Sequence, residues 1–222
     1  MGNVNAVLFD LDGTLLDTAP DLVFALNQLR VKRNLSELPL SAIRSIANLG
    51  SKAMIKHAFD MDETHPQFLN LRQEFLDVYQ LHVANFTRFF PDIDKVLAHL
   101  DEKQIPWGII TNKPTKPAIA LLKHLKFDHR PGCLVCGDSL ATAKPHPATI
   151  IHACSLLKQN PADCLYIGDA ATDVAASKAA GTKSLVALYG YIQEQENPLS
   201  WQADGYINEP IEILDWLKTN AG

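Results

Sequence analysis

The chain has 222 residues, of which 47% are apolar and 20% are charged, and its 20 Lys and Arg against 25 Asp and Glu give a formal net charge of −5. A chain of this length buries about 70% of the surface that its unfolded form exposes, so it forms a core without disulfide or metal cross-links. This composition excludes a disordered or collagen-like chain, and the acidic balance excludes a basic surface for nucleic acid or anionic lipid, which leaves small molecules as the expected partners.

Short apolar runs alternate with longer helical patterns over most of the chain, as in a parallel sheet with crossover helices. The apolar runs that predict strands cover residues 6–9, 107–110, 134–136, 165–167 and 185–188, with a short edge at 206–207. Helical spacing covers residues 91–100, 115–125, 147–157 and 172–180. The sequence therefore predicts an α/β fold with a doubly wound, Rossmann-like parallel sheet.

Residues 18–87 interrupt this alternation, because they contain helical patterns and no clear strand. The helical patterns cover residues 20–33, 41–47, 51–59 and 66–86. The segment follows the first strand, so it leaves the sheet at the edge where ligands bind in open α/β folds. We expect a small all-helical cap at 18–87 and a core made of 1–17 and 88–222. Hinges at Asp17-Thr18 and 85–88 would let this cap close over the site.

The four cysteines form only one C-x-x-C pair, Cys133 with Cys136, inside an apolar strand pattern. A zinc site needs a second pair of ligands, and a thioredoxin-like motif needs a helix after its first cysteine. The sequence therefore predicts buried thiols, with a metal or redox pair as the alternative. The sequence also lacks a signal-peptide pattern and a run of about 18 apolar residues, so we expect a cytoplasmic protein without a membrane partner.

Two carboxylates follow the first strand, in the run Asp10-Leu11-Asp12-Gly13-Thr14. Gly13 permits a tight turn that keeps both acids at the edge of the sheet. The alternative is that Asp12 caps a helix while Asp10 is solvated. A calcium loop does not fit, because its glycine belongs at position 6 and a helix should precede it. A P-loop and a dinucleotide-binding glycine motif are also absent from the sequence.

Polar residues follow two later elements of the core. Thr111, Asn112 and Lys113 end the second strand, where a hydroxyl and backbone N–H groups bind phosphate oxygens. Thr111 would otherwise be a helix N-cap. Lys144 lies between Ala143 and Pro145 in a proline-rich loop, which would hold its ammonium group rigidly, although a single lysine is more often solvated.

A third acidic motif ends the strand at 165–167, in the run from Gly168 and Asp169 to Asp173. At helical spacing the second acid faces the first. Asp169 is then a candidate metal ligand, with Asp173 behind it as a supporting group. The structural alternative is a helix N-cap followed by an acid in the first turn.

Together these residues resemble the haloacid dehalogenase-like phosphohydrolases. The motifs of that family are D-x-D-G-T, an apolar strand ending in Thr or Ser, a Lys usually in K-P-x-P, and G-D-x-x-x-D, and all four occur here in order. The resemblance covers essentially the whole chain, and the helical insert is similar to the small cap of the family. Dehalogenation is not expected, because the dehalogenases of this superfamily lack an acid at the position of Asp12.

The resemblance implies an Mg²⁺-dependent phosphatase that forms an aspartyl-phosphate on Asp10. Asp12 would protonate the leaving alkoxide and then activate water. Thr111 and Lys144 would stabilise the transferring phosphoryl group. Mg²⁺ would be bound by Asp10, the backbone carbonyl of Asp12, and Asp169, since this cation prefers oxygen ligands. The expected substrate is a small phosphorylated metabolite.

The cap offers further candidates for substrate contact. Gly50, Ser51 and Lys52 indicate a turn and a helix start, where backbone N–H groups and a lysine would bind an anion, or else an ordinary helix connection. Arg44 and Arg72 are also in reach of the site, and the sequence does not rank them.

Within the family the chain is most similar to the phosphoglycolate phosphatase group, and particularly to the related N-acetylmuramic acid 6-phosphate phosphatases. The similarity lies in residues 15–21, 107–114, 190–192 and 197–204. Two positions differ: Ser51-Lys52 replaces Ala-Arg, and Ala170 replaces a common acid, so substrate preference is not fixed by the resemblance. A phosphosugar mutase of the same fold and a phosphoryl-accepting signalling domain without turnover are the alternative functions.

Overall fold

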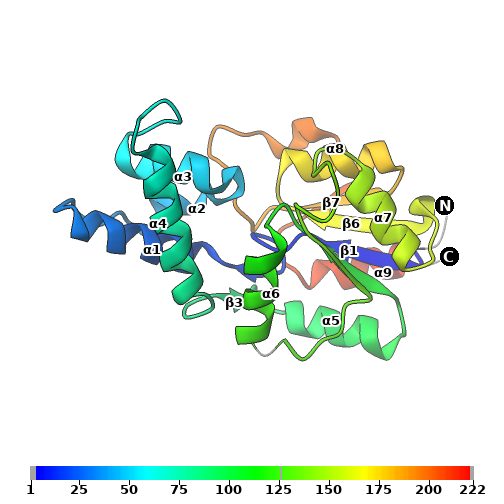
Figure 1. Cartoon of the computed structure of the whole chain (residues 1–222). Coiled ribbons are helices and arrows are strands. Elements are labelled where there is room, and N and C mark those ends of the chain that lie inside the picture. The colour runs from blue at the N-terminus through cyan, green and yellow to red at the C-terminus, as the bar shows by residue number, and fades with distance from the viewer. Residues whose placement is uncertain (1–3, 126, 221–222) are drawn as a thin grey trace.

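The computed structural model describes residues 4–125 and 127–220, and its centre is a six-stranded parallel sheet (Figure 1). The strand order is β5-β4-β1-β6-β7-β8. The strands are β1 (Ala6–Phe9), β4 (Trp107–Ile110), β5 (Cys133–Val135), β6 (Cys164–Gly168), β7 (Lys183–Ala187) and β8 (Gly205–Ile207). The structure confirms the predicted α/β class, and β1 lies between β4 and β6, where the order of the strands reverses direction.

Helices cover both faces of the sheet (Figure 1). One face carries α5 (Ile93–Glu102), α6 (Thr115–His124) and α9 (Glu212–Asn220), and the other carries α7 (Ala148–Leu156) and α8 (Ala171–Ala180). The side chains of β1 alternate between the two layers: Val7 and Phe9 belong to the larger apolar cluster, and Ala6 and Leu8 to the smaller one. A strand buried on both faces explains why this run is apolar throughout.

The cap consists of helices and one short 3₁₀ turn, which lie together beside the sheet in Figure 1. They are α1 (Ala19–Lys32), α2 (Leu40–Arg44), the 3₁₀ turn Ala47–Leu49, α3 (Gly50–Phe59) and α4 (Phe68–Leu81). Two strands of two residues each, β2 (Leu16–Asp17) and β3 (Arg88–Phe89), pair antiparallel where the chain enters and leaves the cap. The boundaries at 17/18 and 87/88, and the hinges at the same places, stay predictions.

The helix expected over 66–86 is wrong at its end, because α4 stops at Leu81. Ala84 has a φ of 66°, which no helix accommodates. The backbone N–H groups of Phe86 and Thr87 donate to the buried carboxylate of Asp21 at 2.8 and 3.1 Å instead of to a helical carbonyl. This tertiary contact holds the segment that follows the helix on its return to the core, and no local pattern reveals it.

The cysteines are buried and free, as predicted. Cys154 and Cys164 have their sulfur atoms 3.6 Å apart, and Cys133 and Cys136 lie on or just after β5. Among the residues that the structure describes, no helix combines the length and apolar character needed to cross a bilayer.

Candidate active site

The predicted motifs meet at the carboxyl edge of the central strands. Asp10 follows β1, Thr111 follows β4, and Asp169 follows β6, while Lys144 reaches the same place from the loop before α7. Because β1 pairs in parallel with both β4 and β6, the ends of these strands are neighbours. A pocket of about 640 Å³ opens between this edge and the cap, and Asp10, Asp12, Thr111, Asn112 and Lys144 line it.

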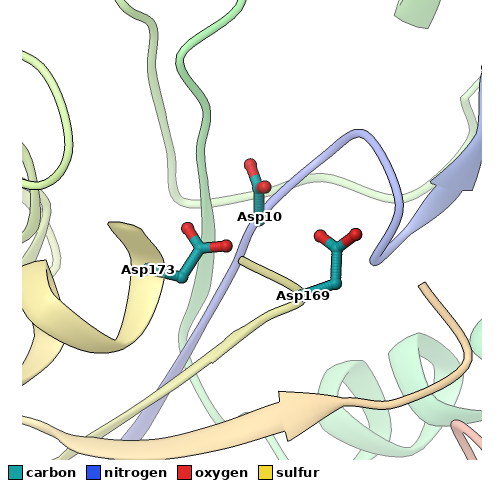
Figure 2. A group of neighbouring side chains, drawn as sticks. All are labelled: Asp10, Asp169 and Asp173. Atoms are coloured by element: carbon teal, nitrogen blue, oxygen red, sulfur yellow. The ribbon is translucent and has the colours of Figure 1, made fainter. Parts of the chain in front are cut away.

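Three buried carboxylates gather beside the pocket: Asp10, Asp169 and Asp173 (Figure 2). One oxygen of each lies within 4.8 Å of the others. Asp10 and Asp169 come from adjacent strand ends, and the Asp10 backbone N–H donates to the Ile167 carbonyl at 2.8 Å. Asp173 enters from the first turn of α8, where its Oδ2 accepts from the Ala170 N–H at 3.0 Å. The strand register and the helix start therefore bring together residues that are up to 163 positions apart, as the residue numbers show.

Lys144 connects two of these carboxylates. Its Nζ lies 2.8 Å from Asp10 Oδ1 and 2.7 Å from Asp173 Oδ1, and its side chain is 2% exposed. The ammonium group also donates to the Tyr166 hydroxyl at 2.9 Å, and that hydroxyl donates to Asp173 Oδ1 at 2.9 Å. Lys144 is thus a buried, ion-paired group and not a solvated surface lysine.

Asn112 holds the backbone of Lys144. Its Nδ2 donates to the Lys144 carbonyl, and its Oδ1 accepts from the Lys144 N–H, both at 3.0 Å. This paired contact joins the loop after β4 to the loop before α7. The backbone of Lys144 is thus fixed through both its N–H group and its carbonyl. Asn112 therefore positions Lys144 as well as lining the pocket.

The electrostatics of the cluster favour a bound cation. Burial raises the pKa of Asp10 above its ordinary value against the opposing effect of Lys144, and burial together with Asp173 raises the pKa of Asp169 to about 7. Burial disfavours the charge of Lys144, but Asp10 and Asp173 outweigh it and raise the pKa of that lysine. If all three carboxylates are ionised, they and the one ammonium group carry two net negative charges, which a divalent cation with oxygen ligands would neutralise.

Asp169 is held by groups from three parts of the chain. Its Oδ1 accepts from the Thr14 hydroxyl at 3.1 Å, and its Oδ2 accepts from the Tyr191 N–H at 2.6 Å and from Asn48 Nδ2 at 2.8 Å. Gly13 has a φ of 84°, and a Cβ there would overlap the Asp169 carboxylate, so glycine is required for both reasons. Asn48 belongs to the cap, which therefore contacts the candidate metal ligand directly.

Asp12 faces a lysine that sequence reasoning gave no role. Its Oδ1 accepts from the Thr18 hydroxyl at 2.6 Å and from Lys113 Nζ at 2.8 Å. The Lys113 side chain is 10% exposed, and its Nζ lies 5.2 Å from the centre of the Tyr79 ring on α4. Its place two residues after Thr111, at a strand end facing the D-x-D motif, was the only signal for this contact.

Thr111 is a pocket residue and not a helix cap. Helix α6 begins at Thr115 and is preceded by Pro114, so the N-cap alternative is wrong. The Thr111 hydroxyl accepts from the Lys113 N–H at 3.0 Å and is buried at the edge of the pocket. That contact occupies an acceptor site and leaves its O–H available as a donor.

All three cap candidates line the pocket, but their contacts differ. Lys52 is exposed, and its Nζ lies 2.7 Å from Glu63 Oε2. Ser51 accepts a hydrogen bond from Arg72 Nε at 2.8 Å, and Gly50 begins α3 with a φ of 78°.

The structure also ranks the two arginines. Arg44 forms an ion pair with Asp17 at 2.8 Å and lies over the Tyr191 ring, away from the residues that line the pocket. Arg72 is part of the pocket wall.

The chain matches the haloacid dehalogenase-like hydrolase family over residues 7–187. An N-acetylmuramic acid 6-phosphate phosphatase from Pseudomonas aeruginosa is 38% identical over 214 residues, which cover 96% of this chain and 95% of that protein. A phosphoglycolate phosphatase from Xylella fastidiosa is 37% identical over 205 residues, which cover 92% of this chain and 89% of that protein. A crystal structure described as a predicted phosphoglycolate phosphatase from Haemophilus somnus has a TM-score of 0.85 and 26% identity, covering 97% of this chain and 99% of that one. From the family match and these similarities over nearly its whole length, the chain belongs to the haloacid dehalogenase-like hydrolases.

Proposed function

We propose that this hydrolase is an Mg²⁺-dependent, cytoplasmic phosphatase that cleaves a small phosphomonoester through an aspartyl-phosphate on Asp10. The observation that carries the proposal is the buried ion pair between Asp10 and Lys144 at the floor of the pocket, beside the carboxylate of Asp169. The names of the similar proteins, which are phosphatases, support the same reaction.

Asp10 is arranged to attack with one defined oxygen. The Leu11 N–H at 2.7 Å and Lys144 Nζ at 2.8 Å both bind Oδ1. Oδ2 has no hydrogen-bond partner among residues 4–125 and 127–220, so its lone pairs are available. This oxygen would form the bond to phosphorus while the bond from phosphorus to the ester oxygen breaks.

Asp12 would supply and remove the proton. The carboxylic acid protonates the ester oxygen as it leaves, and the resulting carboxylate accepts a proton from the water that attacks the aspartyl-phosphate. The second step releases inorganic phosphate and restores Asp10. Because Thr18 and Lys113 both bind Oδ1 of Asp12, the proton would be carried by Oδ2.

The transferring phosphoryl group carries negative charge that needs stabilisation. The Thr111 hydroxyl and the Lys144 ammonium group are the donors at the ends of the strands, and Asn112 holds Lys144 in place. Preorganised donors of this kind lower the barrier because they need not reorient during the reaction.

The donor set fits Mg²⁺, since it consists of carboxylate and carbonyl oxygens. Asp10, Asp169 and the Asp12 carbonyl would hold the ion, which when bound offsets the negative charge of the phosphate and of Asp10. Asp173 would stay outside this set, because Ala170, Lys144 and Tyr166 occupy its oxygens. Its role would be to hold Lys144.

Metal removal gives the first test of the proposal. Phosphate release from 2-phosphoglycolate and from N-acetylmuramic acid 6-phosphate is expected with Mg²⁺ and should fall to background after treatment with EDTA. Added Mg²⁺ should restore it, and Asp169→Asn should raise the Mg²⁺ concentration needed for half-maximal activity. Full activity in EDTA would contradict the metal dependence.

The phosphate-release assay also distinguishes the phosphatase from the two alternative functions, a mutase and a signalling domain. A need for a sugar bisphosphate primer would indicate a mutase, and a long-lived phosphorylated Asp10 without phosphate release would indicate a signalling domain. Either result would contradict the proposed phosphatase.

Lys113→Met tests the positioning of Asp12. For an alkyl phosphomonoester we expect kcat/KM to fall about 10- to 100-fold, because the poor leaving group depends on proton transfer from a correctly placed acid. For p-nitrophenyl phosphate, whose leaving group needs little protonation, the fall should be less than about 3-fold. Lys116→Met, which removes an exposed cation at the same pocket, is the matched control. Equal losses on both esters would show that Lys113 acts on binding or folding instead.

A further inference from the structure

Arg72 is the half-buried cation of the pocket that lacks a carboxylate partner among the described residues. It lies on α4 and its Nε donates to the Ser51 hydroxyl at 2.8 Å. The four lysines that line the pocket differ from Arg72 in their pairing or exposure. Lys113 and Lys144 are paired with acids of the site, Lys52 is paired with Glu63, and Lys116 is exposed to solvent.

The contact with Ser51 leaves the outer edge of the guanidinium free. Nε is engaged, whereas the two terminal nitrogens have no hydrogen-bond partner within residues 4–125 and 127–220. Two parallel N–H groups on a planar fork match the two oxygens of a carboxylate. Since Ser51 fixes the plane of the fork, less conformational entropy is lost when an anion binds.

The pocket around Arg72 is larger and more apolar than a phosphate site alone requires. Its volume is about 640 Å³, within the range of pockets that hold ligands of about drug size. Apolar side chains from three cap helices line it, namely Leu22, Met54, Phe75 and Leu76. An ester of two carbon atoms would leave most of this surface uncovered, whereas a sugar-sized group would bury it.

We propose that Arg72 binds a carboxylate on the organic part of the substrate, so that the enzyme selects sugar-sized phosphomonoesters that carry an acid. This inference rests on the proposed phosphatase function and adds to it the residue that discriminates between esters. Phosphoglycolate and N-acetylmuramic acid 6-phosphate, which give the similar proteins their names, both contain a carboxylate. Lys52, one of the three cap residues expected to bind an anion, forms an exposed ion pair with Glu63.

The test compares two esters that differ by the acidic group. N-acetylmuramic acid 6-phosphate carries a lactyl carboxylate that N-acetylglucosamine 6-phosphate lacks. The wild-type enzyme should prefer the first, and Arg72→Met should lower the ratio of the two kcat/KM values about 10- to 100-fold, as expected for a lost charge-assisted hydrogen-bonded pair. Arg72→Lys should give a smaller loss, because the charge remains without the fork. An unchanged ratio in Arg72→Met would overturn the proposal.

Two further measurements distinguish a failure of the carboxylate-site proposal from a failure of the phosphatase proposal. Calorimetric titration measures the affinity of Asp10→Asn, and of the double variant Asp10→Asn/Arg72→Met, for each of the two esters without turnover. The ratio of the two affinities then replaces the ratio of the two kcat/KM values. If the wild type releases no phosphate but the affinity ratio still depends on Arg72, the phosphatase proposal fails and the carboxylate site stands. Lys116→Met should leave the ratio unchanged, which controls for the general positive charge of the pocket.

Discussion

Asp10→Asn should lower kcat by at least about 10⁴-fold, as loss of a covalent nucleophile does in other hydrolases. The amide is nearly isosteric with the carboxylate and can still accept from the Leu11 N–H, but its oxygen is a far weaker nucleophile. The fold should remain intact, because the change also removes one of three neighbouring buried carboxylates. Phosphate release and thermal unfolding, measured on the same preparation, check both statements.

The matched control for Asp10→Asn is Asp77→Asn, which changes an exposed acid in the wall of the same pocket. This control should keep nearly full activity. Trapping with radiolabelled ester gives a second readout, since label should be retained by the wild-type protein during turnover and not by Asp10→Asn. Turnover that survives in Asp10→Asn would place the nucleophile at another residue.

Lys144→Met should have the second largest effect, on both activity and stability. Removal of one partner of a buried ion pair leaves unpaired charge in the interior and lowers the free energy of unfolding by about 3–5 kcal/mol. Here both Asp10 and Asp173 lose their ammonium partner, whose side chain is 2% exposed. We also expect kcat to fall about 10²- to 10³-fold, because a preorganised donor to the phosphoryl group is lost.

Urea unfolding of Lys144→Met in EDTA and in Mg²⁺ checks the electrostatic cause. The loss of stability should be larger in EDTA, because a bound divalent cation would partly replace the missing positive charge. Lys116→Met should unfold like the wild type in both conditions. If Lys144→Met were equally stable with and without Mg²⁺, the three carboxylates would not share one electrostatic site with the ion.

The sequence predicted the strands and the residues at their ends because local patterns determine both. A buried parallel strand needs a continuous apolar run, and polar residues directly after it lie at the carboxyl edge by geometry alone. Asp10, Asp12, Thr111 and Asp169 were predicted to lie at this edge for that reason, and Lys144 was predicted from its motif and its proline-rich loop. The order of these motifs also identified the family, which the match over residues 7–187 confirms.

The contacts among these side chains were decided by tertiary structure. The position of Lys113 after a strand was only a weak signal in the sequence, because a lysine near a strand end is usually solvated, and in the folded chain it lies beside Asp12 and the Tyr79 ring. Asn48 and Tyr191 reach Asp169 from segments more than 20 residues away, so no periodicity links them to it.

The cap shows the same division most clearly. Its helical character follows from local spacing, so the sequence by itself determined that residues 18–87 contain helices and no long strand. Which cap side chains face the pocket depends on how those helices pack against the core and on which charges pair before a substrate arrives. Lys52 and Arg72 are both cations in the sequence, but Glu63 occupies the first and Ser51 orients the second. Ion pairs between residues distant in sequence form only when the chain has folded, and for this reason the tertiary structure alone decided which cation is free to bind an anion.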